Sequence, residues 1–264
     1  MKIYLDGVGL RGPGLADWMT GREILAERGP YRPAEVILSA SELLPPAERR
    51  RTTETIKLAL AVGSEAMALL DVRSEKTPSV FASSGSDGAT ITSILEILAS
   101  ADREVSPTRF HNSVHNAPSG YWSIATGSQE ASTSVCGHDF SFAAGFLEAA
   151  GQVLIGQETV LLVAYDLPYP RPLHAARPIL GIFGTALVLA SRPSERTLAA
   201  LSLKLSRGDG PPTAMAQPDL EALRSGNPAA HALPLLAAVA KGAEREVVIP
   251  YVAGNLLTLR VAPP

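Results

Sequence analysis

The sequence predicts an α/β fold, in which helices are layered against a β-sheet. Strand and helix signals alternate along the 264 residues, and this alternation is the first observation that favours the class. The second is the run 160–164 (VLLVA), which is continuously apolar and typical of a strand buried on both faces. The third is the alanine-rich segment 140–150, which predicts a buried helix packed closely on the sheet.

The first 70 residues predict one strand and one helix. Residues 3–5 form a short strand and are followed by three glycines, Gly7, Gly9 and Gly12. These glycines match the G-x-G-x-x-G pattern of dinucleotide-binding turns, but the Pro13-Gly14 pair disfavours the helix that such a site requires, so no nucleotide site is predicted. Residues 30–46 are proline-rich and predict a loop with a short apolar piece, and from about 46 to 70 the apolar residues recur at helical spacing.

The later elements follow the same alternation. Residues 79–82 predict a strand that ends at the SSGSDG turn, and residues 89–99 predict a helix with one apolar face. Downstream of the 160–164 strand the sequence predicts strands at 184–189 and 199–205, a loop at 208–218, a helix at 219–240, and two strands within 247–261 joined by a turn at Gly254-Asn255.

Three polar motifs favour structural roles over ligand binding. The SSGSDG turn at 83–88 lacks the lysine of a phosphate-binding loop, so we interpret it as the cap of the following helix. His111 and His115 lie four residues apart without a glutamate between them or an obvious third ligand, so no metal site is predicted. Arg49–Arg51 indicate a solvated basic face, with docking of an acidic carrier protein or of a partner subunit as the alternative. No cofactor is predicted.

Composition excludes several classes of partner. The net charge of −3 and the pI near 6.0 provide no basic field for a nucleic acid backbone. A single cysteine excludes an internal disulfide and fits a reducing compartment. The start MKIYLDGVGL lacks the apolar core of a signal peptide, and no apolar run approaches the roughly 20 residues of a membrane span. The sequence therefore predicts a cytoplasmic protein without a membrane span or a nucleic acid partner.

The most informative stretch runs from Ser106 to Ala150. It contains the pattern Asn116-x3-Gly120-x2-Ser123-Ile124-x2-Gly127, followed by STSVC and the alanine-rich segment. This pattern resembles that of the β-ketoacyl synthases, the thiolase-fold condensing enzymes of fatty acid and polyketide assembly. In that family the cysteine at this position accepts the acyl group, although here the spacing between Gly127 and Cys136 is a few residues shorter than in catalytic members.

A narrower resemblance extends along nearly the whole chain. The chain is similar to the ketosynthase-like chain-length factors of aryl polyene pigment clusters, in the runs IYLDGVGLRGPGLADW, LPPAERRRT, FASSGSDG, SPTRFHNSVHNAPSGYWSIATGS and VLLVAYDLPYP. The resemblance implies one ketosynthase-like domain over residues 1–264, with a truncated thiolase-like fold of helices around a mixed sheet. It also implies that Gly7–Gly12 form the turn after the first strand.

Cys136 is the candidate acyl nucleophile, and Ser134, His138 and Phe140 are candidates for a pocket beside it. We expect Cys136 at a strand-to-helix turn near a hydrophobic cavity, with the helix N-terminus behind it. In catalytic ketosynthases two histidines from the second half of the fold act with the cysteine, but the histidines downstream here are only His138, His174 and His231, without the family's glycine-rich surroundings. A thiol without a fixed base is a poor catalyst, so we expect an incomplete condensing site.

The resemblance also implies an interface, because thiolase-fold dimers pair through the strand that leads to the nucleophile. The candidate interface residues lie between 123 and 135 and are Ser123, Ala131, Ser132, Thr133 and Val135. The partner that we expect is a catalytic ketosynthase in a heterodimer, with a homodimer as the fallback and an acyl carrier protein as a further partner. Two alternatives stay open: an active β-ketoacyl synthase or acyltransferase that uses Cys136, and a self-associating scaffold.

Overall fold

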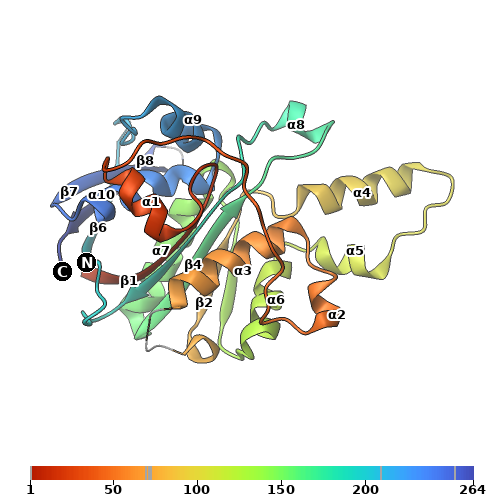
Figure 1. Ribbon diagram of the computed structural model, residues 1–264, viewed down its shortest axis with the longest axis horizontal. Helices are drawn as coiled ribbons and strands as arrows, with labels where there is room; N and C mark the ends of the chain where they lie inside the picture. Colours follow the sequence, from red (N-terminus) through yellow and green to blue (C-terminus); the bar gives the residue numbers. More distant parts are fainter. Residues whose placement is uncertain (1, 69, 71–72, 209, 253) are drawn as a thin grey trace.

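The computed structural model describes residues 2–68, 70, 73–208, 210–252 and 254–264. Within them, eight strands form one mixed sheet in the order β3-β2-β4-β5-β1-β6-β8-β7 (Figure 1). The β2 strand pairs in parallel with β3 and with β4, and the other pairs are antiparallel. The strands are β1 (Lys2–Arg11), β2 (Ser79–Ala82), β3 (Ser132–Val135), β4 (Thr159–Asp166), β5 (Phe183–Ala190), β6 (Ala199–Arg207), β7 (Arg245–Tyr251) and β8 (Asn255–Ala262).

The strands predicted from apolar runs are confirmed. Every residue of 160–164 in β4 is buried, as expected of a strand that is covered on both faces. The predicted strands at 79–82, 184–189 and 199–205 correspond to β2, β5 and β6. Gly254 has a φ of 76° in the turn between β7 and β8, a left-handed conformation that glycine adopts without steric cost.

The first strand is longer than predicted, and the expectation of a turn at Gly7 is wrong. Gly7 and Gly9 lie inside β1 and pair with Val188 and Ala186 of β5. A Cβ atom on Gly9 would lie 1.9 Å from the backbone oxygen of Val62 in the helix above it. The glycines therefore allow a helix to pack closely on β1, and the chain turns only beyond Arg11.

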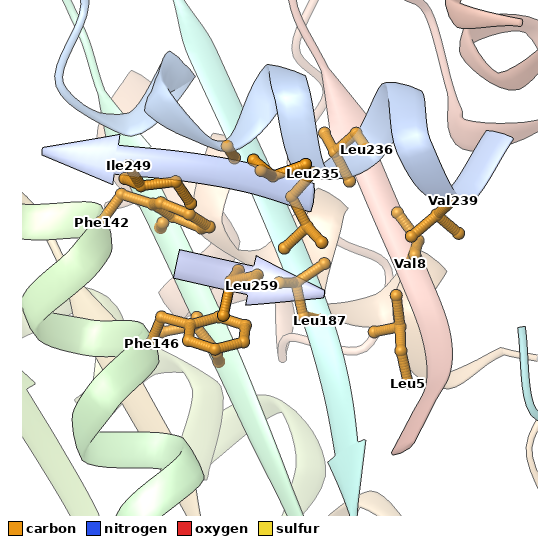
Figure 2. Close-up of a cluster of buried hydrophobic side chains, with 14 of the residues drawn as sticks. Leu5, Val8, Phe142, Phe146, Leu187, Leu235, Leu236, Val239, Ile249 and Leu259 are labelled. Atoms are coloured by element: carbon orange, nitrogen blue, oxygen red, sulfur yellow. The ribbon is translucent and has the colours of Figure 1, made fainter. Parts of the chain in front are cut away.

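Helices cover both faces of the sheet. On one face lie α3 (Glu54–Met67) and α6 (Ala117–Thr126), which pack on Phe81, Leu161 and Val163. On the other face lie α1 (Trp18–Leu25), α7 (Ser141–Ile155) and α10 (Leu233–Lys241). Figure 2 shows Phe142 of α7 beside Ile249 of β7 and Phe146 of α7 beside Leu259 of β8, in a cluster that also contains Leu235 and Leu236 of α10. The predicted buried helix at 140–150 is thus confirmed and begins at Ser141.

Two predicted helices are interrupted. Residues 46–70 contain α2 (Pro46–Arg49) and, after a break, α3. Residues 219–240 contain α9 (Pro218–Gly226), the 3-10 helix η3 (Ala229–Ala232) and α10. The second break occurs at Asn227, whose φ of −137° and ψ of 121° are extended. Pro228 follows it, and proline disfavours the helical conformation in the residue before it.

The helix predicted at 89–99 is confirmed as α4 (Gly88–Ala99), which is followed by α5 (Pro107–Asn112). Both helices project away from the sheet (Figure 1). The side chains of Leu95 and Leu98 on the apolar face of α4 are therefore about half exposed, at 52% and 48%. The remaining short helices are η1 (Ser74–Lys76), η2 (His138–Phe140) and α8 (Leu173–Ala176). No helix among the described residues has the length and apolar character needed to cross a membrane.

Candidate functional site

Cys136 directly follows β3 and precedes η2 and α7, so the predicted strand-to-helix turn is confirmed. Its side chain is exposed, and its thiol donates a hydrogen bond to the backbone oxygen of Ser84 at 3.4 Å. Ser84 lies in the turn after β2. Because β2, β3 and β4 are parallel, the turns that follow all three strands meet at one edge of the sheet.

Asp166, the last residue of β4, anchors the turn after β2. Its Oδ1 atom accepts hydrogen bonds from the backbone N of Ser84 (2.8 Å), from Ser84 Oγ (2.7 Å) and from Ser83 Oγ (3.2 Å). The side chain is almost completely buried, and burial raises the pKa of Asp166 to about 6 despite the opposing hydrogen bonds of Ser84 and Ser83. A buried carboxylate thus holds the residue whose carbonyl faces the Cys136 thiol.

Tyr169 packs over the same turn from the segment that follows β4. A Cβ atom on Gly85 would lie 1.5 Å from the Tyr169 hydroxyl, and one on Gly88 would lie 1.9 Å from the Tyr169 ring. The two glycines therefore leave the space that Tyr169 occupies. Asp87, between them, accepts a hydrogen bond from the backbone N of Thr90 at 2.8 Å, so the predicted capping role of the SSGSDG turn is confirmed.

The histidines downstream of Cys136 have other partners. Nε2 of His138 lies 2.6 Å from an Arg177 guanidinium nitrogen, and the same guanidinium bonds Asp139 at 2.9 Å. His174 lies on α8 and His231 on η3, where burial lowers the pKa of His231 to about 4. None of the hydrogen bonds in the described part of the chain joins a histidine to the Cys136 thiol.

The two histidines upstream of Cys136, His111 and His115, also have contacts elsewhere in the fold. Nε2 of His115 lies 3.1 Å from the backbone oxygen of Ser83, so this ring contacts the turn after β2. His111 makes an edge-to-face contact with Tyr121, with ring centroids 6.2 Å apart. Across the described ranges, no group of three His, Cys, Asp or Glu side chains is close enough to hold a metal ion.

The three candidate pocket residues lie in different surroundings. His138 lines a cavity of about 350 Å³ together with Asp139, Arg177 and His231, and Ser134 and Phe140 are not among its lining residues. The hydroxyl of Ser134 is buried without a hydrogen-bond partner within the described ranges. Phe140 is half-buried at the end of η2. This cavity is therefore polar where the His138 and Arg177 side chains meet. Cys136 is not among its lining residues either, so it is not the hydrophobic cavity that we expected beside Cys136.

The candidate interface residues lie on or near β3, which forms one end of the sheet. Ala131 and Ser132 are exposed, while Thr133 and Val135 are half-buried. Ser123 is half-buried on α6, a helix that contacts β3. The structure thus gathers these residues at one sheet edge.

Sequence reasoning missed Asp166 and Tyr169, which are both close to Cys136 in space. A signal was present, because Asp166 is an acidic residue two positions after the apolar run 160–164. A carboxylate at the carboxyl end of a buried parallel strand faces the turns of the neighbouring strands. Tyr169 carried no such signal, since its position depends on the course of an irregular segment.

The comparisons with solved structures give the fold. A chain in the structure of the ketosynthase ApeO in complex with its chain length factor ApeC, from Xenorhabdus doucetiae, matches with a TM-score of 0.74 and 21% identity, over 98% of this chain and 99% of that chain. A chain of AntDE:AntF, a type II PKS acyl-carrier protein in complex with its ketosynthase, matches with a TM-score of 0.75 and 13% identity, over 100% of this chain and 99% of that chain. A β-ketoacyl synthase from Burkholderia phymatum matches with a TM-score of 0.61 and 12% identity, over 91% of this chain and 70% of that chain.

These similarities confirm a thiolase-like fold of the ketosynthase type in a truncated form. The comparison with curated proteins finds no match. The family described as "Beta-ketoacyl synthase, N-terminal domain" matches residues 23–249, which is most of the chain. The chain therefore belongs to the β-ketoacyl synthase N-terminal domain family.

Proposed function

We propose that this protein is a non-condensing chain-length factor, a ketosynthase-like subunit that pairs with a catalytic β-ketoacyl synthase and shapes the acyl tunnel of a type II polyketide system. The assignment to aryl polyene biosynthesis rests on the sequence resemblance. The same resemblance supports four further parts of the proposal. They are a single domain over residues 1–264, an acyl carrier protein as a further partner, a pocket formed by Ser134, His138 and Phe140, and the absence of a cofactor. A cytoplasmic location rests on the single cysteine, which fits a reducing compartment.

The observation that carries the proposal is the hydrogen bond of Cys136. A condensing cysteine reacts as a thiolate and requires a base or an oriented positive charge nearby. Here the thiol donates to the Ser84 carbonyl, while His138 pairs with Arg177. The hydrogen-bond partner of the thiol is thus a carbonyl and not a base, so this arrangement favours a structural cysteine over a nucleophile.

The two ends of the sheet support a pairing role for β3. At the far end, β7 is protected: Thr213 bonds both the backbone N and the backbone O of Val248, and Pro250 offers no N–H group. Within the described residues β3 pairs with β2 alone, and its sequence STSV contains neither a charge nor a proline. An unprotected edge strand is a template for pairing with another chain.

Exposed apolar side chains near this edge support the same role. Phe110 on α5 is 65% exposed, and Ile124 on α6, beside β3, is 46% exposed. Leu95 and Leu98 are exposed on the projecting α4, which contacts α5. Exposed apolar side chains beside an unpaired edge strand favour association, and a second thiolase-like subunit that pairs with β3 would cover Ile124.

The test is co-expression with a full-length catalytic ketosynthase, followed by size-exclusion chromatography with light scattering and mass spectrometry of the products. The proposal expects a 1:1 complex, and a product length that changes when this subunit is exchanged for a related one. Separate elution of the two chains would contradict it.

The alternative of an active condensing enzyme has its own readout. Incubation of the isolated chain with an acyl carrier thioester, followed by peptide mass spectrometry, would reveal an acyl group on Cys136. The proposal expects none, and a Cys136→Ala variant that still supports product formation in the complex. A self-associating scaffold would instead form homo-oligomers and leave the product length unchanged.

A further inference from the structure

Asp166 is the most deeply buried acidic side chain near Cys136, and the proposed function assigns it no role. Its relative exposure is 2%, and it lies at the carboxyl end of β4, one strand removed from the Cys136 turn across β2. All three of its hydrogen bonds reach Oδ1, while Oδ2 has no partner among the described residues. Burying a carboxylate oxygen without a hydrogen-bond partner lowers the stability of the fold. Such a residue therefore calls for a role that its other oxygen performs.

What Asp166 fixes is the first half of the turn after β2. Ser84 bonds Asp166 through its backbone N–H and its hydroxyl, which fixes the Ser83–Ser84 peptide plane and the Ser84 side chain. Ser83 is held to Asp166 through its own hydroxyl, which also accepts from the backbone N of Ser86 at 2.9 Å. The Ser84 carbonyl belongs to the next peptide plane, whose Gly85 N–H donates to Ser83 Oγ at 3.5 Å. Asp166 therefore constrains this plane through both Ser84 and Ser83, and the Ser84 carbonyl in it accepts from the Cys136 thiol.

We propose that Asp166 is a positioning residue for Cys136: it holds the Ser83–Gly88 turn so that the Ser84 carbonyl restrains the thiol through their hydrogen bond. Alkylating agents react with the free thiolate, so the restraint lowers the reactivity of an exposed cysteine. This inference concerns Cys136 itself and is independent of whether the chain acts as a chain-length factor.

The groups around Asp166 define how the restraint depends on pH. The charge of Arg177 favours the ionised form of the Asp166 carboxylate. Tyr165, the neighbouring residue on β4, is fully buried, and its pKa is raised by burial and then by the charges of Asp166 and Asp87. Tyr169 and His115 complete the surroundings of the turn. Since burial raises the pKa of Asp166 to about 6, the strong charge-assisted hydrogen bonds to Ser84 are present above that pH and weaken below it.

The experiment measures the alkylation rate of Cys136 by iodoacetamide from pH 5 to pH 8, with mass spectrometry as the readout. Because the chain has one cysteine, the modified residue is unambiguous. We expect Asp166→Ala to raise the rate at pH 8 by about threefold to tenfold relative to wild type, the range that loss of one or two hydrogen bonds gives. The ratio of the two rates should fall toward one below pH 6, where the wild-type restraint is itself weakened.

Asp6→Asn is the matched control. Asp6 lies on β1, away from Cys136, and is another buried carboxylate that accepts hydrogen bonds from two hydroxyls, those of Ser194 and Thr197. It should leave the rate within twofold of wild type. If Asp166→Ala does not fold, Ser84→Ala removes only the hydroxyl bond and should give an intermediate increase. An unchanged rate in both folded variants, or a ratio that is the same at pH 5 and pH 8, would overturn the proposal.

Discussion

At the scale of single residues, the contact of Tyr169 with Gly88 gives a sharp prediction. Gly88→Ala should destabilise the fold by roughly 1–3 kcal/mol, because its new Cβ would lie 1.9 Å from the Tyr169 ring, although alanine is the better helix former. Thermal or urea unfolding measures the change.

Gly151→Ala in α7 is the control for this substitution, since no atom lies within 4 Å of its added Cβ. It should stabilise the protein by up to roughly 1 kcal/mol. Combining Gly88→Ala with Tyr169→Ala should cost less than the sum of the two single changes. Additive effects would mean that the ring and the glycine do not interact.

The sequence identified Cys136 and the cap at Asp87 because both depend on neighbours in the chain. Asp87 bonds the backbone N three residues ahead, a spacing that can be read directly. The Ser84–Cys136 and Asp166–Ser84 contacts join residues 52 and 82 positions apart, so they follow from strand order, which one sequence does not reveal. The role of a glycine is ambiguous in the sequence for the same reason. Gly9 allows the close approach of Val62 and does not form a turn.

At the scale of elements, β3 should fail to pair if its outer edge is blocked. Ser79 N bonds Ala131 O and Ser83 N bonds Val135 O, so alternate residues of β3 face β2 and the backbone groups of Ser132 and Ser134 face outward. Ser134→Pro removes an outward N–H without removing a bond to β2, and proline is tolerated on edge strands. We expect loss of the complex with the ketosynthase, measured by light scattering of the co-expressed pair.

Arg245→Ala, on the protected edge strand β7, is the matched control and should leave the complex intact. A second variant, Thr133→Arg, places a charge on β3 and should also abolish the complex while the isolated chain still folds. Thr133 accepts a hydrogen bond from Gln152 on α7 at 3.3 Å, so its folding is checked first by circular dichroism. A complex that survives Ser134→Pro would place the interface elsewhere.

Element types were predictable where local pattern and burial agree. The run in β4 is apolar and buried on both faces, so the sequence-based prediction was correct. The prediction of one helix over 219–240 is wrong because apolar residues lie on both sides of Pro228, where the backbone must change. The sequence pattern predicts the apolar face of α4 but not that this face is exposed. Periodicity shows which side of a helix is apolar, and does not show whether another element packs on that side.

At the scale of the whole molecule, two groups whose pKa values are shifted by burial should give the free energy of unfolding opposite dependences on pH. Asp166 has a pKa raised from 3.8 to about 6, so its folded form binds the proton more tightly and its contribution to stability is lost as the pH rises through 6. His231, near Arg224, Asp139 and Glu221, has a pKa lowered from 6.5 to about 4, so its contribution is lost as the pH falls through 4. Each change is on the order of 1–3 kcal/mol, and the two offset each other.

The prediction is tested by urea unfolding from pH 4 to pH 7. Relative to wild type, Asp166→Asn should make stability rise more steeply with pH, and His231→Gln should make it fall with pH. Parallel profiles for the wild type and both variants would show that neither group titrates differently in the folded and unfolded chain.

The central position of β1 has a consequence for how the chain is made. Tyr4 pairs with Ala190 of β5, and Lys2 pairs with Ser202 of β6, so neither neighbour of β1 exists until most of the chain has been synthesised. At about 5–20 residues per second, the ribosome needs roughly 10–40 s to bridge that gap. During this time a segment whose Ile3, Leu5 and Leu10 side chains end up fully buried has no strand to join. The oldest part of the nascent chain is therefore among the last to be completed, and the newborn protein depends on being shielded from aggregation until its second half emerges.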